Sequence, residues 1–280
     1  MAKVKIVTDS LADIPQNILD ELDITCVPCI VRFGEREYRD KVELTTQEFY
    51  KLLTSSAHSP ATSQPASGEF EQIYRDLAPS HPEILSIHVI GALSGTLNSA
   101  RLAAQNIPNA RIELFDTFQL SMAQGWLVIL AARAAQAGNS LDDILAMLTD
   151  VRERVHIIGM LNTLEYAQRG GRLGKGAALV GTLLNVKPLI SIVRGEIVPV
   201  ENVRTQKRAL ERLVEIVYGS GPIQHLAVIH ADARRDGWEL VQKFAQTLPE
   251  DQIILTETGP VLGTHTGPGA VAVAWVTGKY

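Results

Sequence analysis

The sequence predicts an α/β protein with an N-terminal parallel-sheet α/β/α domain and a C-terminal mixed-sheet α+β domain. The chain has 280 residues, enough for two domains of ordinary size. Up to residue 155, apolar β-type runs alternate with helical patterns, which is typical of a parallel sheet covered on both faces. Two later β-type runs are separated by three residues, which is hairpin spacing. The predicted domains span residues 1–155 and 156–280.

The N-terminal domain is expected to alternate strands with amphipathic helices. Apolar and β-branched runs predict strands at residues 4–8, 25–33, 84–90 and 111–115. Helical periodicity predicts helices at residues 46–54, 68–77, 95–106, 119–137 and 141–154. Thr45 and Glu48 form the pattern of a capping box before the first of these helices, and Ser140 is the expected cap of the last.

The C-terminal domain is expected to begin with a hairpin. Its strands are predicted at residues 188–193 and 197–200, on either side of Arg194, Gly195 and Glu196. A helix at 205–217, a strand at 226–230, a helix at 237–248 and a strand at 270–276 follow. The charge-free stretch 258–278 is long enough to span a bilayer, but its glycine and proline content favours a buried loop and strand.

Composition and charge exclude several classes of protein. Hydrophobic residues make up 46% of the chain and charged residues 20%, as in a soluble globular protein. The net charge of −5 provides no overall basic field, so we expect no nucleic-acid binding. The N-terminus lacks the apolar core of a signal peptide, and two cysteines form no disulfide framework, so a cytoplasmic location is expected.

Three local motifs do not fit their usual context. Cys26 and Cys29 have the spacing of a redox or zinc pair but lie in an expected apolar strand, and their role is left open. The seven histidines form no chelating pattern, so no metal is expected. The segment 267–272 fits G-x-G-x-x-A, yet no βαβ unit can follow it, and the glycine-rich segment 170–176 lacks residues that a phosphate loop needs.

Two hydroxyl-rich clusters are the candidates for a binding site. Residues 55–65, SSAHSPATSQP, are expected to form a loop between two helices, and Ser94 follows an expected strand where a helix begins. The carboxyl edge of a parallel sheet and a helix N-terminus both favour an anionic ligand. The alternative is that Ser94 caps its helix and that Thr62 and Ser63 fill a turn. A nucleophile elbow would need glycine where Ala92 and Thr96 stand.

Six segments, taken in order, resemble the DegV family, and the resemblance runs from residue 3 to the C-terminus. They are Thr8-Asp9-Ser10, Thr62-Ser63-Gln64-Pro65, Ser94-Gly95-Thr96, Arg169 to Leu173, Lys187-Pro188 and Gly259 to Gly269. The resemblance implies a long-chain fatty acid enclosed between two domains. It further implies the role of FakB, the acyl-binding subunit of bacterial fatty acid kinase, in phospholipid synthesis. This subunit presents the bound carboxylate to a separate ATP-binding subunit, FakA, for conversion to an acyl phosphate.

The resemblance also implies which residues bind the ligand. Thr62 and Ser94 would hydrogen-bond the carboxylate, and Arg172 and His265 would complete the polar mouth. The ligand-binding residues implied in full are Thr62, Ser63, Ser94, Gly95, Arg172, His265 and Thr266. Ala66 departs from the serine that often follows the Thr-Ser-Gln-Pro run. Arg204 lies where members of the family contact the kinase subunit, although it also fits an ordinary solvated charge at a helix start.

The resemblance thus implies a binding subunit that is not an enzyme by itself and holds no cofactor or metal, since ATP and magnesium belong to the partner. Two alternatives stay open. One is a lipid carrier or sensor without kinase coupling, and the other is an enzyme such as a serine hydrolase. The sequence leaves undecided the acyl chain length and unsaturation, the identity of the kinase partner, the oligomeric state and any transient contact with a membrane surface.

Overall fold

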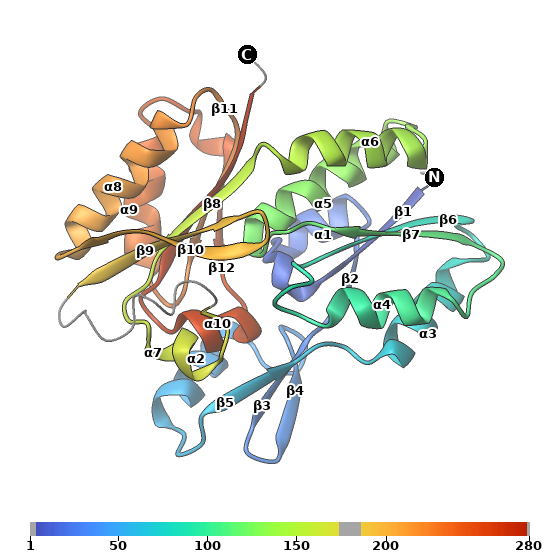
Figure 1. Cartoon of the computed structure of the whole chain (residues 1–280), viewed down its shortest axis with the longest axis horizontal. Coiled ribbons are helices and arrows are strands. Elements are labelled where there is room, and N and C mark those ends of the chain that lie inside the picture. Colours follow the sequence, from blue (N-terminus) through green and yellow to red (C-terminus); the bar gives the residue numbers. More distant parts are fainter. Residues whose placement is uncertain (1–3, 174–185, 279–280) are drawn as a thin grey trace.

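The N-terminal half of the protein forms a parallel sheet, as predicted. The computed structural model describes residues 4–173 and 186–278 (Figure 1). The sheet has the order β2-β1-β6-β7, and every neighbouring pair is parallel. Its strands are β1 (Val4–Asp9), β2 (Thr25–Val27), β6 (Glu83–His88) and β7 (Arg111–Asp116). A short 3-10 turn (Ser10–Ala12) and α1 (Gln16–Glu21) connect β1 to β2.

Helices cover both faces of this sheet. The helices α3 (Ser67–Leu77) and α4 (Thr96–Ala104) form a core with one face. The helices α5 (Ser121–Gln136) and α6 (Leu141–Arg152) lie on the other side. Twelve of the sixteen residues of α5 are buried, because this helix contacts β1 and β6 on one side and β8 and β13 of the second sheet on the other. A helix enclosed in this way is apolar around most of its circumference.

The C-terminal half forms the predicted mixed sheet, in the order β10-β9-β8-β13-β11-β12. The pair β11 and β12 is parallel, and the other pairs are antiparallel. Its strands are β8 (Val155–Met160), β9 (Lys187–Val193), β10 (Glu196–Val203), β11 (Ile223–His230), β12 (Ile253–Glu257) and β13 (Val271–Thr277). The helices α8 (Gln206–Gly219) and α9 (Arg234–Phe244) cover its outer face and share a second core with it.

The prediction of one strand at 25–33 was wrong, because the chain changes sheet in that segment. β2 ends at Val27, and β3 (Ile30–Phe33) pairs instead with β4 (Arg36–Arg39) and β5 (Pro60–Ser63) in a small antiparallel sheet. Pro28 has no backbone N–H for a ladder, and the N–H of Cys29 donates to Ser10 Oγ at 3.1 Å. The break therefore moves Cys29 out of any strand.

Other segments also differ from the prediction, which lacked α1, β4, β8 and β12 altogether. The hydroxyl-rich stretch 55–65, expected as a loop, contains β5, whose residue Thr62 pairs with Val31. The stretch 258–278, expected as loop and strand, begins with the helix α10 (Pro260–Thr266). Pro260 at its first position fits a helix N-terminus, and seven residues are too few to display a periodic pattern. The helix α10 contacts α2 (Thr46–Ser55), β3, β5 and α7 (Glu165–Arg169).

A continuous hydrophobic core runs from β1 through α5 to the inner face of the C-terminal sheet. It includes Val4, Trp126 and Ala274, and the indole Nε1 of Trp126 donates to the carbonyl of Ala274 at 3.3 Å. The chain passes from the first sheet to the second between the end of α6 and the start of β8. The domain boundary between residues 155 and 156 stays a prediction.

Candidate functional site

A large apolar cavity lies between the two sheets. The inner face of the C-terminal sheet forms one wall, in which Ile190, Gly159, Ala272 and Ile229 are neighbours across four strands. Leucine, isoleucine and valine side chains of the N-terminal domain form the opposite wall: Leu11, Val89, Ile90, Leu93 and Leu120. The empty space inside and in front of the cavity, open solvent included, is about 1270 Å³. An elongated apolar molecule is the kind of ligand that such walls accommodate.

The cavity lies at the topological switch point of the parallel sheet. From β1 the chain continues to β2 on one side of the sheet. From β6, which is the other neighbour of β1, it continues in the opposite direction to β7. The connections after β1 and β6 therefore diverge and leave a crevice between them, which is where open α/β sheets bind ligands. Leu11 after β1 and Ser94 after β6 both line the cavity.

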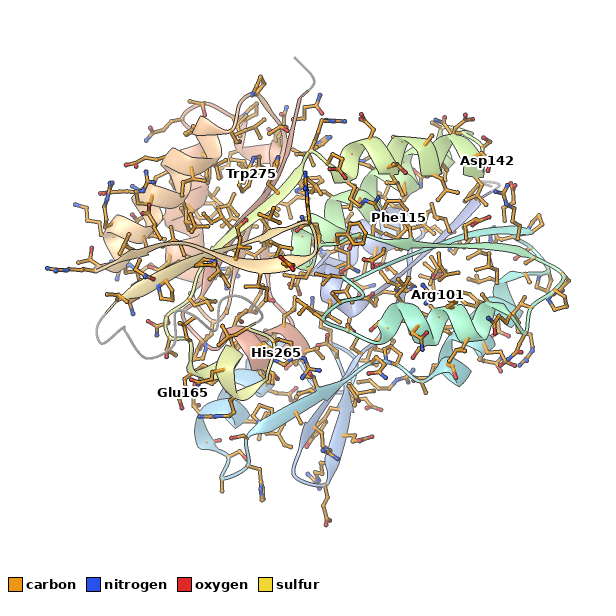
Figure 2. The ribbon with its side chains drawn as sticks, viewed as in Figure 1. Arg101, Phe115, Asp142, Glu165, His265 and Trp275 are labelled. Carbon is orange, nitrogen blue, oxygen red and sulfur yellow. The ribbon has the colours of Figure 1, made fainter. Side chains whose placement is uncertain are left out.

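The structure brings all seven predicted ligand-binding residues to the lining of this cavity. They are Thr62, Ser63, Ser94, Gly95, Arg172, His265 and Thr266. Thr62 Oγ1 and His265 Nε2 form a hydrogen bond of 2.9 Å, although 203 positions separate them in the chain. In Figure 2, His265 lies on α10, between the C-terminal sheet and the small antiparallel sheet. Their role in ligand binding stays a prediction.

His265 is neutral at physiological pH. Burial, and secondly the charge of Arg172, lowers its pKa to about 4. Its Nδ1 is buried and has no hydrogen-bond partner among the described residues. A Cβ at Gly170 would lie 2.1 Å from this nitrogen, so only glycine fits there. Arg172 lies exposed at the mouth and donates from Nη1 to the carbonyl of Gly170 at 2.7 Å. The positive charge of the mouth therefore comes from Arg172.

Ser94 and Gly95 lie where the chain enters α4. The N-cap residue is Gly95 and not Ser94, and Ser94 Oγ accepts from Thr96 N at 3.3 Å in a local turn. Ser94 Oγ and Thr96 Oγ1 are also 2.8 Å apart. The alternative in which Ser94 caps its helix and Thr62 and Ser63 fill a turn is therefore wrong, because Gly95 is the cap and Thr62 and Ser63 lie in β5. Its hydroxyl keeps hydrogen-bonding capacity for a ligand, since a hydroxyl accepts twice and donates once.

The sequence analysis missed Gln64 as a site residue. Gln64 lines the cavity, and a Cβ at Gly95 would lie 3.0 Å from its amide carbon Cδ. The absence of a side chain at Gly95 therefore lets this amide approach the start of α4. Gln64 belongs to the Thr-Ser-Gln-Pro motif, which was the one signal that could have identified it.

A buried carboxylate, also missed, holds α10 in place. Asp13 accepts hydrogen bonds from Lys41 Nζ at 2.9 Å, Ser121 Oγ at 2.8 Å and Thr258 Oγ1 at 2.7 Å. It also accepts from the backbone N–H of Gly259, the N-cap of α10, at 2.9 Å. We call this arrangement the Asp13 clasp. It ties the helix that carries His265 to the N-terminal domain, and a carboxylate at a helix N-terminus is a favourable placement.

Burial raises the pKa of both thiols, to about 12 for Cys26 and well above its ordinary value for Cys29. Protonated thiols are poor nucleophiles and poor metal ligands. Within residues 4–173 and 186–278, no group of three or more His, Cys, Asp or Glu side chains could hold a metal ion. Residues 174–176 of the glycine-rich segment lie outside the described residues.

A serine–histidine–aspartate chain exists, but away from the cavity. His88 Nδ1 is 2.8 Å from Asp9 Oδ2, and His88 Nε2 is 2.7 Å from Ser86 Oγ, which in turn contacts Tyr74 Oη at 2.7 Å. All four side chains are fully buried, and none lines the cavity. A nucleophile must meet its substrate, so this buried row of side chains does not support the hydrolase alternative.

Arg204, the residue predicted to contact a kinase subunit, lies outside the cavity. Arg204 lies between β10 and α8, is exposed and is not part of the cavity lining. None of the helices in the described part of the chain has the length and apolar character to cross a membrane.

The family model described as "Uncharacterised protein, DegV family" matches residues 3–278. The chain belongs to the DegV family. It is similar to Protein DegV of Bacillus subtilis, with 33% identity over 276 residues that cover 97% of this chain and 98% of that protein.

Two solved DegV structures share the fold. The first, from Thermus thermophilus and described by its fatty acid binding, has a TM-score of 0.92 and 32% identity, covering 98% of this chain and 99% of that one. The second, DegV from Bacillus subtilis, described as a fatty acid binding protein, has a TM-score of 0.90 and 32% identity, covering 99% of this chain and 100% of that one. The two-domain α/β architecture predicted from the sequence is therefore that of the DegV family.

Proposed function

We propose that this protein binds a long-chain fatty acid in the cavity between its two sheets, with the carboxylate at the polar mouth. One observation carries the proposal: hydroxyl, imidazole and guanidinium groups from separate segments meet at the wall of a mainly apolar cavity. The fatty acid binding described for the DegV proteins of Thermus thermophilus and Bacillus subtilis supports it.

The mouth has the groups that a carboxylate needs on leaving water. A buried carboxylate is stable only when several donors hydrogen-bond its oxygens. Thr62 and Ser94 supply hydroxyl donors, and Arg172 supplies a charge at the exposed edge. In its neutral form His265 donates from one ring nitrogen and accepts at the other. Its Nε2 lies 2.9 Å from Thr62 Oγ1, so His265 would orient the Thr62 hydroxyl toward the carboxylate.

The cavity walls supply the free energy for the acyl chain. A sixteen-carbon chain has about fourteen methylenes, and at roughly 0.8 kcal/mol each their burial approaches about 11 kcal/mol. Association and ordering cost at least about 4 kcal/mol. With hydrogen bonds to the carboxylate added, the dissociation constant is in the micromolar range or tighter.

We further propose that the protein presents the carboxylate to a separate ATP-dependent kinase subunit, with Arg204 at the contact. In that reaction a carboxylate oxygen attacks the γ-phosphorus of ATP, the bond to the ADP oxygen breaks, and acyl phosphate and ADP form. ATP and magnesium come with the partner. This chain would orient the acceptor oxygen, and Arg172 would neutralise negative charge near it.

The test has two stages. Freshly purified protein is denatured and extracted with organic solvent, the extract is analysed by mass spectrometry, and stripped protein is titrated with palmitate. Stoichiometric lipid or saturable binding at micromolar concentration is expected, and the lack of both would contradict fatty acid binding. A kinase subunit and ATP are then added. Bound lipid that is never phosphorylated would favour a lipid carrier or sensor without kinase coupling. Turnover without a partner would indicate an enzyme.

A further inference from the structure

The short helix α7 packs against α10, although the two are far apart in the chain (Figure 1). The helix α10 carries His265 and Thr266, and the turn directly after α7 carries Arg172. These two elements therefore hold three of the candidate ligand-binding residues that line the cavity. The way in which α7 and α10 pack together sets the positions of these groups relative to one another.

Each of the two segments places a ring against a glycine of the other. A Cβ at Gly267, directly after α10, would lie 2.1 Å from Tyr166 Cδ2 and 2.5 Å from Tyr166 Cε2. A Cβ at Gly170, directly after α7, would lie 2.1 Å from His265 Nδ1. Both rings occupy space that a Cβ would need, so the backbone of each segment approaches the ring of the other closely. We call this reciprocal contact the glycine interlock.

Tyr166 has a second neighbour besides Gly267. The guanidinium carbon of Arg169 lies 5.8 Å from the centroid of the Tyr166 ring, and Arg169 Nη1 donates to Ser59 Oγ at 3.2 Å. The ring is half-buried, and Tyr166 is not one of the residues that line the cavity. Any effect of Tyr166 on ligand binding is therefore exerted through its neighbours.

Hydrogen bonds connect the interlock to the polar mouth. On one side, His265 Nε2 lies 2.9 Å from Thr62 Oγ1 of β5. On the other, the backbone N–H of Arg172 donates to the carbonyl of Ala167 at 3.3 Å, and Arg172 Nη1 donates to the carbonyl of Gly170 at 2.7 Å. The glycine that accommodates the His265 ring thus also accepts from the guanidinium group. A displacement of α7 would move Arg172 away from its place beside His265.

We infer that the glycine interlock positions the polar mouth and that Tyr166 is its positioning residue. The inference rests on the proposed fatty acid binding. The contact of Tyr166 with Gly267 holds α7 against α10, and thereby holds Arg172 in place. A carboxylate binds tightly when its partners already stand at the right distances in the free protein, because ordering them during binding costs free energy. Close packing of a ring on a glycine backbone leaves little room for sliding.

Replacement of Tyr166 tests the inference with two lipids. Tyr166→Ala should weaken palmitate binding about ten-fold but change binding of methyl palmitate by less than about two-fold, since the ester offers no charge to the mouth. Tyr166→Phe keeps the ring edge that meets Gly267 and should bind palmitate as the wild type does. Tyr218→Ala is the matched control, because Tyr218 is a partly exposed tyrosine that contacts Phe244 outside the cavity lining, and it should leave both affinities unchanged. Equal losses for both lipids in Tyr166→Ala, or no loss for palmitate, would overturn the inference.

Gly170→Ala tests the other half of the interlock and serves if Tyr166→Ala fails to fold. The φ angle of Gly170 is −74°, which alanine adopts without strain, but the added methyl group would displace His265. Palmitate affinity should fall about five-fold or more in the wild-type background, and less than about two-fold in a His265→Ala background, where that space is free. Equal losses in both backgrounds, or none in the first, would overturn the inference. Wild-type protein that binds no palmitate would contradict the proposed function as well.

Discussion

Two buried histidines of this protein lie in opposite situations. His88 is fully buried, and Asp9 and Ser86 satisfy both of its ring nitrogens. His265 is also largely buried and lines the cavity, but Thr62 contacts only one ring nitrogen, and the other is buried against Gly170 without a partner. A saturated polar network stabilises a fold, whereas an unsatisfied polar group beside a cavity indicates a ligand. The triad-like order of residues at His88 is therefore the weaker functional signal.

Replacement of each histidine by alanine should separate the structural role of His88 from the ligand-binding role of His265. His88→Ala leaves the buried Asp9 carboxylate without its imidazole partner, so we expect the free energy of unfolding to fall by about 3 kcal/mol or more. His265→Ala should lower it by only about 1 kcal/mol while weakening palmitate binding about ten-fold. Urea unfolding and palmitate titration measure the two effects. Equal losses of stability in both variants would remove the distinction.

The pH dependence of the free energy of unfolding is a second test of the buried state of His265. Burial first, then the charge of Arg172, lowers the pKa of His265 from 6.5 to about 4. The unfolded chain takes up this proton as the pH falls below 6.5, while the folded protein does not until about 4. The stabilisation is therefore complete above pH 6.5 and lost on acidification, by roughly 3 kcal/mol in total. Urea unfolding between pH 7.5 and 4 should show a flatter profile for His265→Asn, and identical profiles would contradict this.

Hydroxyl deletion tests the other side of the polar mouth. Ser94→Ala should remove a charge-assisted hydrogen bond worth roughly 1.5–3 kcal/mol, and weaken palmitate binding by about an order of magnitude or more. Thr62→Ala should act similarly and also release His265 from its partner. Calorimetric titration measures both, with circular dichroism as the check on folding. An unchanged affinity in the double variant would exclude the two hydroxyls from the site.

Asp40 should show the opposite pH dependence to His265. Burial raises the pKa of its carboxyl from 3.8 to about 6, although the charge of Lys41 and the hydrogen bond from Ser10 oppose this. The folded protein thus binds this proton more tightly than the unfolded chain, and the stabilisation present at low pH is lost as the pH rises through about 6. Asp40→Asn should therefore gain about 1–2 kcal/mol relative to wild type at pH 7.5. Urea unfolding at pH 7.5 and 5 checks this, and a variant destabilised equally at both values would contradict it.

The smallest effect on binding is expected far from both histidines. Arg204→Ala should leave palmitate affinity unchanged and reduce only acyl-phosphate formation with a kinase subunit, as loss of an interface anchor would. Arg208→Ala is the matched control, because Arg208 lies four positions away and is engaged with Glu211 and Glu215. Equal loss of binding and of phosphorylation in Arg204→Ala would place this residue in the fold or the pocket instead.

Local sequence signals determined the regular part of the fold. The capping box at Thr45 and Glu48 and the cap at Ser140 are present as predicted. The β9–β10 hairpin also forms around the expected turn at Arg194 and Gly195. These features depend on residues within a few positions of each other, so a short window of sequence contains their cause. The seven candidate site residues were predicted differently, through the order of six motifs that resemble the DegV family.

Only the tertiary structure decided how those pieces meet. The hydrogen bond between Thr62 and His265 spans 203 positions, and that between Asp13 and Gly259 spans 246. The strand β5 and the helix α10 escaped prediction because each is too short to show a clear periodic pattern in the sequence. Their stability comes from packing against β3 and α2, contacts that no short window contains. The sequence therefore determined most of the longer elements and the candidate site residues, while long-range packing decided their geometry, because burial and hydrogen bonding depend on neighbours in space.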